Sequence, residues 1–247
     1  MWIQWIVVYC IILTVYGQTI SDYKTLIRQL SNNYDNSVRP VVDQSQPVSL
    51  SIALDLLAIQ EFDEVLEKFS VAAVIYIRWR DPSMKWESST YNNLHTIMIP
   101  KSKVWTPTII VKNSFDTVKP IGDDWMKIRY YKNGDAVYIA GNVFKTTCAV
   151  DVTFYPYDAQ TCNITLISWP EIANEITISA YEDNILNSHF SENGEWEVTS
   201  TSVTTGTIEK LSTIDFTIKL KRRPIFILVN FLLPVFFIGI LNIMSSI

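Results

Sequence analysis

The sequence is poor in histidine, cysteine and glycine, and each shortage excludes a class of function. The 247 residues include 2 His and 3 Cys, too few for a protein with several zinc sites. Only 7 Gly stand beside 8 Trp and 12 Tyr, which argues against a glycine-rich nucleotide-binding α/β enzyme. The net charge of −5 argues against a nucleic-acid-binding protein, because such a protein needs a basic face. No nucleophile, base and orienting group can be assembled from the sequence, so we expect no enzyme, no cofactor and no metal site.

Apolar residues gather at both ends of the chain. At the N-terminus, residues 1–17 are uncharged, and the stretch 6–15 has the length of the apolar region of a signal peptide. Val15 and Gly17 are small residues placed for cleavage before Gln18. We expect a signal peptide at 1–17; because no basic residue precedes the run, an uncleaved membrane anchor is the alternative. Secretion places the rest of the chain in an oxidising compartment.

At the C-terminus an uncharged run covers residues 224–247 and follows Lys221-Arg222-Arg223. As a helix it would be about 36 Å long at ~1.5 Å per residue, enough to cross a bilayer core of ~30 Å. Pro234 and two asparagines interrupt it, which is tolerated where neighbouring helices cover that face. We expect the first helix of a transmembrane bundle at 223–247, with a solitary anchor as the alternative. The basic triplet would lie on the outer side, so it needs a structural partner there.

Between the two ends, one helical pattern precedes a series of strand patterns. Apolar residues at helical spacing predict a helix over 21–34, with Ser21 as its N-cap. From residue 48 onward, apolar and polar residues alternate, which predicts half-buried strands. The predicted strands cover 48–56, 71–79, 96–100, 108–112, 136–140, 148–154, 161–168, 176–180, 196–203 and 214–220. This repetition fits a single antiparallel β-sandwich domain, and we expect it to occupy 18–222.

Two cysteines remain after Cys10 leaves with the signal peptide. In an oxidising compartment Cys148 and Cys162 are expected to form one disulfide, which closes a loop of about 15 residues. Inside the loop, Pro156 between two tyrosines is a candidate for a cis peptide bond. Asp158 at the tip of the loop needs a partner if it is buried, and Arg222 is available.

These residues resemble the signature loop of the Cys-loop receptors, the pentameric ligand-gated ion channels, and most of all their nicotinic acetylcholine receptor branch. The pattern Cys148-x13-Cys162 encloses Tyr155-Pro156-Tyr157-Asp158. Further motifs follow in the family's order across residues 20–247. They are Trp79-Arg80-Asp81, Trp86, Val104-Trp105-x-Pro107, Lys112-Asn113-Ser114, Gly194-Glu195-Trp196, Arg222, Pro224 and Asn230-x3-Pro234.

The resemblance implies a mainly β fold, with an N-terminal helix, a ten-stranded immunoglobulin-like β-sandwich and then a transmembrane α-helix. It implies that five homologous subunits form a ring in the plasma membrane, including synaptic membranes, with the sandwich extracellular. A small neurotransmitter-like ligand would bind between neighbours in an aromatic box by cation–π attraction. The Cys loop, with Tyr155, Pro156, Tyr157 and Asp158, would face the membrane domain, where Asp158 pairs with Arg222 and couples the two domains.

One face of the implied aromatic box departs from the family pattern. Trp169 aligns with its key tryptophan, but Lys112 and Leu211 stand where tyrosines occur, and Thr108 replaces an aspartate. Because a good ring contributes about 0.5–2 kcal/mol and a lysine repels a cation, we expect no binding of acetylcholine in the usual way.

The face that would be presented to a neighbouring subunit is weakened as well. Val74 stands where this face has a tryptophan, while Val137 and Ile139 align with its apolar wall. Elsewhere, the sequon beginning at Asn163 is expected to carry a glycan, and the acidic stretch 63–67 is expected to be a solvated turn.

The sequence therefore predicts a subunit of a ligand-gated channel that couples ligand binding to the opening of a pore. The pore-lining second helix of the family does not follow within residues 1–247, so we expect a chain truncated after its first transmembrane helix. The alternative is a membrane-tethered, non-conducting decoy or a subunit that modulates assembly. An immunoglobulin-like adhesion domain fits poorly, because its disulfide joins cysteines tens of residues apart.

Overall fold

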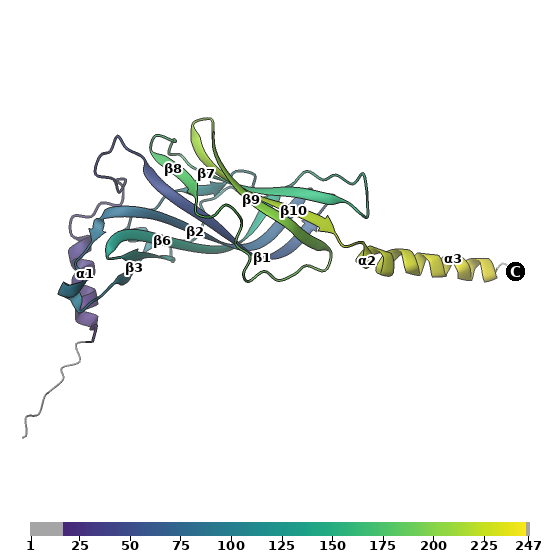
Figure 1. Ribbon diagram of the computed structural model, residues 1–247, viewed down its shortest axis with the longest axis horizontal. Coiled ribbons are helices and arrows are strands. Elements are labelled where there is room, and N and C mark those ends of the chain that lie inside the picture. Colours follow the sequence, from purple (N-terminus) through teal and green to yellow (C-terminus); the bar gives the residue numbers. More distant parts are fainter. Residues whose placement is uncertain (1–16, 246–247) are drawn as a thin grey trace, which may run out of the picture.

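Two β-sheets packed face to face make up most of the computed structural model, which describes residues 17–245. A helix lies across one end of the sandwich, and a second helical segment projects from the opposite end (Figure 1). The helices are α1 Ile20–Ser31, α2 Pro224–Ile227 and α3 Leu233–Ser245, with 3-10 turns at Ser88–Tyr91 and Lys101–Lys103 and a π-helical turn at Leu228–Leu232. The strands are β1 Val48–Asp63, β2 Lys68–Lys85, β3 Thr96–Pro100, β4 Ile109–Val111, β5 Lys127–Tyr131, β6 Asn133–Thr147, β7 Ala159–Ser168, β8 Ile176–Ala180, β9 Trp196–Ile208 and β10 Leu211–Arg222.

The two sheets share one core. The larger sheet has the order β3-β5-β6-β2-β1-β8 and the smaller the order β4-β7-β10-β9. Alternate residues of each central strand point inward: Ile75 and Ile77 from β2 face the layer that holds Phe216 and Ile218 from β10, all at most 1% exposed. This period-two burial is the pattern that predicted the strands. The mainly β fold with ten strands, an N-terminal helix and a C-terminal apolar helix is confirmed in the described chain.

Strand pairing differs from the purely antiparallel arrangement that we expected. β1 pairs with β8 in parallel, from Val48 opposite Ile176 to Ile52 opposite Ala180. The chain can do this because β8 is reached through a long crossover rather than a hairpin. The other paired strands run antiparallel, and most extend several residues beyond their predicted limits.

Two strand predictions fail in opposite ways. The segment 148–154 is not a strand, because its backbone closes turns: Tyr155 N–H donates to the carbonyl of Val152, and Tyr157 N–H to that of Phe154. Conversely, β5 was missed, because Ile128 and Tyr130 are its only buried side chains and basic residues surround them. Pairing with β3 along its whole length and with β6 holds this short strand in the sheet.

The N-terminal helix begins earlier than predicted and also ends earlier. Thr19, not Ser21, is the N-cap: its hydroxyl accepts from Asp22 N–H, and the Asp22 carboxylate accepts from Thr19 N–H at 2.8 Å. This capping box satisfies two backbone donors at once. The helix ends at Ser31, so Tyr34 lies beyond it and donates its hydroxyl to buried Asp81 at 2.7 Å.

We expect Thr19→Ala to destabilise the protein by about 1 kcal/mol, because it leaves helix donors unsatisfied. Ser21→Ala is the matched control, since Ser21 is exposed and lies inside the helix. Equilibrium unfolding followed by circular dichroism measures both variants. Equal losses of unfolding free energy in Thr19→Ala and Ser21→Ala would contradict the assignment of Thr19 as the N-cap.

The C-terminal segment changes helix type before Pro234. Leu233 N–H donates to the carbonyl of Leu228, five residues back, in the π-helical turn. A proline lacks an N–H and clashes with the carbonyl four residues before it, and a wider turn relieves that clash. Within residues 17–245, Leu228–Ser245 is the one helical stretch that is long and apolar enough to cross a membrane, and it is almost entirely exposed.

Candidate functional site

A disulfide closes the loop that leads from β6 to β7. Cys148 and Cys162 are bonded, as predicted, with Cα atoms 5.2 Å apart, and both are buried. The Tyr155–Pro156 peptide is cis, also as predicted. Inside the loop, the Gln160 side chain exchanges two hydrogen bonds with the backbone of Asp151, at 3.0 and 2.7 Å. The loop is therefore held by bonds across its width as well as by the cystine.

Asp158 and Arg222 meet at the base of this loop. Arg222 Nε donates to Asp158 Oδ1 at 2.7 Å, and a second guanidinium nitrogen donates to Oδ2 at 3.1 Å. The two side chains are 2% and 5% exposed, so the forked pair is sheltered from water. The backbone joins as well, since Arg222 N–H donates to the carbonyl of Asp158 at 3.1 Å. The structure thus brings together two residues that the sequence separates by 64 positions.

Arg222 has three further neighbours that the sequence did not identify. Its guanidinium also binds Glu64 Oε1 at 2.5 Å, and its central carbon lies 4.2 Å from the Trp196 ring and 5.1 Å from the Tyr155 ring. Glu64 lies in the β1–β2 turn that we expected to be simply solvated. That expectation is wrong for Glu64, which is only 31% exposed. A cation between two carboxylates and two aromatic faces is strongly held.

The charges in this cluster are stabilised against their burial. Burial by itself raises the pKa of the Asp158 carboxyl, but hydrogen bonds from Arg222 and Gln160 outweigh it, so the pKa lies below its usual value. Burial likewise opposes the charge of Arg222, yet hydrogen bonds to Asp158 and Glu64 raise the pKa of its guanidinium. Both groups are therefore charged at neutral pH. The cluster joins the β1–β2 turn, the disulfide loop and the end of β10.

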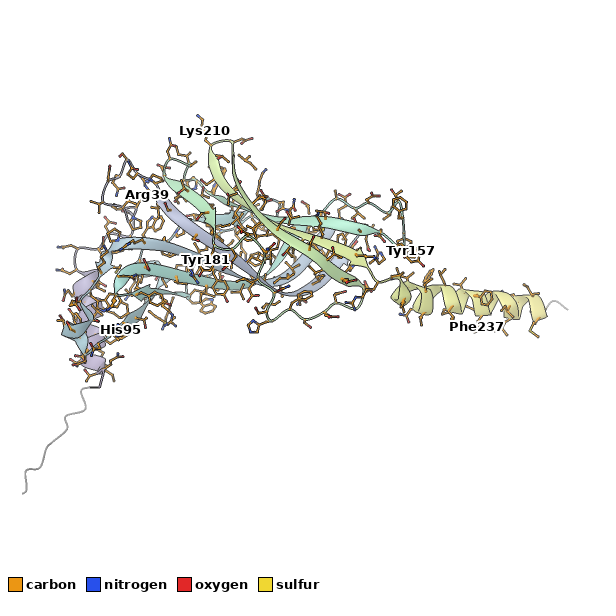
Figure 2. The ribbon with its side chains drawn as sticks, in the orientation of Figure 1. Arg39, His95, Tyr157, Tyr181, Lys210 and Phe237 are labelled. Atoms are coloured by element: carbon orange, nitrogen blue, oxygen red, sulfur yellow. A yellow bond between two sulfur atoms is a disulfide. The ribbon has the colours of Figure 1, made fainter. Side chains whose placement is uncertain are left out.

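The disulfide loop carries three exposed aromatic side chains. Phe154, Tyr155 and Tyr157 are 73%, 54% and 65% exposed. Tyr157 lies at the end of the sandwich from which the helix projects (Figure 2). Large exposed aromatic side chains on a rigid loop are typical of a contact surface.

Trp169 and Lys112 line the same pocket, which has a volume of about 470 Å³. Trp169 follows the end of β7 and is 52% exposed, and Lys112 follows β4 and is exposed. Backbone pairing fixes the two segments, because Trp169 N–H donates to the carbonyl of Thr108 and Lys112 N–H to that of Thr165. Thr108 lies in the wall of the same pocket. Leu211 is not part of this wall; it begins β10 and pairs with Ile208 beside the hairpin turn, whose tip carries Lys210 (Figure 2).

Val74, Val137 and Ile139 lie on the other sheet from Trp169. Their partly exposed side chains share the outer face of β2 and β6, where Val137 pairs with Arg78. Arg78, which no sequence motif marks, stacks its guanidinium on Tyr181, with its central carbon 4.0 Å from the ring centre. One chain therefore does not bring these residues together with Trp169 into a single pocket.

Asn163 is exposed on β7, which leaves its side chain accessible, and its glycosylation remains a prediction. Within residues 17–245, no group of three or more His, Cys, Asp or Glu side chains could hold a metal ion. The predicted signal peptide lies almost wholly outside the described residues, so its assignment also remains a prediction.

Comparison with known proteins places these features in a family. The sequence profile described as "Neurotransmitter-gated ion-channel ligand binding domain" matches residues 23–224. The chain is 33% identical over 226 residues to the neuronal acetylcholine receptor subunit alpha-9-II of Oncorhynchus mykiss, covering 87% of this chain and 40% of the relative. It is 32% identical to the human alpha-9 subunit, covering 87% and 46%, and 26% identical to the alpha-type des-2 subunit of Caenorhabditis elegans, covering 89% and 42%. The chain thus spans less than half the length of these curated relatives.

Proposed function

This chain belongs to the neurotransmitter-gated ion-channel ligand-binding domain family, and on that premise we propose that it is a subunit of a nicotinic-receptor-like channel. Residues 18–222 would form its extracellular ligand-binding domain, and 223–247 its first transmembrane helix. Ligand binding between homologous subunits of a pentamer would open a pore in the plasma membrane. The chain is not an enzyme, since the family consists of ligand-gated channels.

The observation that carries the proposal is the cluster around Arg222. Asp158, in the disulfide loop, holds the arginine that ends β10, two residues before α2 begins at Pro224. A movement of the sandwich therefore reaches the membrane helix through a buried, charged contact rather than a loose linker. Such a contact can differ between two states of a protein, which is what coupling between two sites requires.

Subunit contacts would use the outer face of β2 and β6. Ile139 there is 47% exposed and Val143 is 44% exposed. Because Trp169 lies on the other sheet, a ligand that contacts both sets of residues must lie between two subunits. We propose that Trp169 and Lys112 face such a ligand from one subunit, while Val74, Val137 and Ile139 face it from the next. Leu211 would contribute from the hairpin.

We expect this chain, expressed together with a homologous nicotinic-type subunit, to co-purify with that subunit and to change its ligand-evoked current. Ile139→Glu should weaken co-purification at least about fivefold, since it buries a charge at the contact. Val42→Glu is the matched control, because Val42 is 91% exposed and lies outside this face. Affinity purification and patch-clamp recording provide the two measurements. The proposed function would be contradicted if the chain formed no complex with the homologous subunit and left its ligand-evoked current unchanged.

A further inference from the structure

The pocket beside Trp169 is unusual in its charge. Its wall is mostly apolar and includes Ile110, Val118 and Ile167. Two lysines, Lys112 and Lys119, complete it, and no aspartate or glutamate lies among the residues that line it. The site therefore combines an indole, aliphatic side chains and positive charge.

Neither lysine forms a salt bridge within the described chain. Across residues 17–245, no carboxylate lies within 4.0 Å of the ammonium of Lys112 or Lys119, and both side chains are exposed. Nearby Lys145, in contrast, pairs with Asp116 at 2.8 Å. The two pocket ammonium groups are thus available to a ligand.

The strand register explains why the charge faces the pocket. Thr108, Ile110 and Lys112 are spaced two residues apart, so they point to one side of the β4 segment. Ile110 pairs with Ile167, and Trp169 lies two residues farther along on the same side. Thr108 occupies the position where the family resemblance would place an aspartate, so this wall lacks a carboxylate that could offset Lys112.

We propose that this pocket binds a small organic carboxylate with an apolar or aromatic body, and not a quaternary ammonium. This inference rests on the proposed function and specifies the ligand class of that site. The carboxylate is attracted by Lys112 and Lys119 through charge-assisted hydrogen bonds, while the apolar body packs against Trp169 and Ile110. A cation near the same indole is repelled by Lys112 at short range, which outweighs the cation–π attraction of a single ring.

Three probes with the same phenylpropyl body separate the effect of charge from that of shape: 3-phenylpropionate, 3-phenylpropionamide and trimethyl(3-phenylpropyl)ammonium. Each is titrated calorimetrically into the full chain in lipid nanodiscs at low ionic strength. We expect the anion to bind about tenfold more tightly than the cation, with the amide between them. Added salt should lower the affinity of the chain for the anion and leave its affinity for the amide unchanged.

The variants locate the effect. Lys112→Gln should lower the affinity for 3-phenylpropionate about five- to tenfold and leave the affinity for 3-phenylpropionamide unchanged. Lys112→Tyr should reverse the preference toward the cation, since it restores a second ring. Lys24→Gln is the matched control, because Lys24 is exposed on α1, far along the chain from the pocket and absent from its wall.

The inference is overturned if the cation binds as tightly as the anion, if none of the probes binds at 10 mM, or if Lys112→Gln leaves anion binding intact. The co-purification experiment with the homologous subunit does not depend on these probes. If the chain assembles with the homologous subunit but does not bind the anion, the proposed ligand class is wrong and the proposed function still stands. Failure of assembly would remove the proposed function itself.

Discussion

Asp158→Asn should destabilise the protein by about 3 kcal/mol, or about 6–12 °C in Tm, one of the two largest losses we expect. The reason is that Arg222, 5% exposed, would keep its charge while losing its forked carboxylate partner. Glu64 would remain bound to Arg222. The loss of stability should therefore lie near the lower end of the roughly 3–5 kcal/mol that removing one partner of a buried ion pair costs. Thermal unfolding of the full chain in detergent, followed by tryptophan fluorescence, measures the effect.

Glu192→Gln is the matched control for this prediction. Glu192 binds the neighbouring Arg223 at 2.9 Å, but it is 76% exposed, so its loss should cost less than about 1 kcal/mol. The double variant Asp158→Leu/Arg222→Met removes both charges and keeps the unbranched stem beside Trp196. It should be more stable than Asp158→Asn alone, because the one charge left without its partner, that of Glu64, is 31% exposed and can be hydrated, whereas Arg222 is 5% exposed. A double variant that is less stable than the single one would contradict this account.

Acid should reproduce the same loss in the native chain. The pKa of Asp158 is lowered in the folded state, so the pair stabilises the fold above the ordinary carboxyl pKa of about 4. That stabilisation is lost as the pH falls through the lower, folded-state pKa. Asp158→Asn lacks the titrating group, so the stabilities of the two proteins should converge as the pH is lowered.

Local pattern was enough to predict most of the sandwich, and the exceptions have a physical cause. Strands β3 and β8 match their predicted limits, because alternation is visible even in five residues. The segment 148–154 alternates equally well, yet the sheet offers it no partner once the chain turns at the disulfide loop. Alternation reports burial on one face, whereas a strand also needs a neighbour for its backbone hydrogen bonds.

The sequence was enough to predict the ion pair at the site, but not the further residues that contact it. Asp158 and Arg222 could be paired from the sequence, because each needs an opposite charge and one was available. Glu64 could not, since it is 158 residues from Arg222 and its acidic turn looks like any solvated turn. Arg78 was missed for a similar reason: its partner Tyr181 belongs to the segment after β8, which only the folded chain brings over β2.

Removing the disulfide with Cys148→Ala/Cys162→Ala should cost about 3 kcal/mol, as a closed loop of about 15 residues implies. The double variant and the reference chain both carry Cys10→Ser, so that no free thiol can exchange even in chains that keep residues 1–17. Chemical unfolding measures the total loss, and hydrogen exchange shows where it falls. We expect faster exchange within residues 149–161 and unchanged exchange in α1, which lies at the opposite end of the sandwich (Figure 1).

The stability lost on removing the disulfide should not simply add to the stability lost on breaking the buried ion pair. The loop places Asp158 against Arg222, so a loosened loop weakens the forked contact before Asp158 is substituted. Adding Asp158→Asn to the cysteine variants should therefore cost less than the roughly 3 kcal/mol expected of Asp158→Asn in the oxidised chain. Fully additive losses would show that the disulfide and the ion pair stabilise the protein independently. The disulfide would then contribute only through the unfolded chain, and the loop would hold Asp158 in place without it.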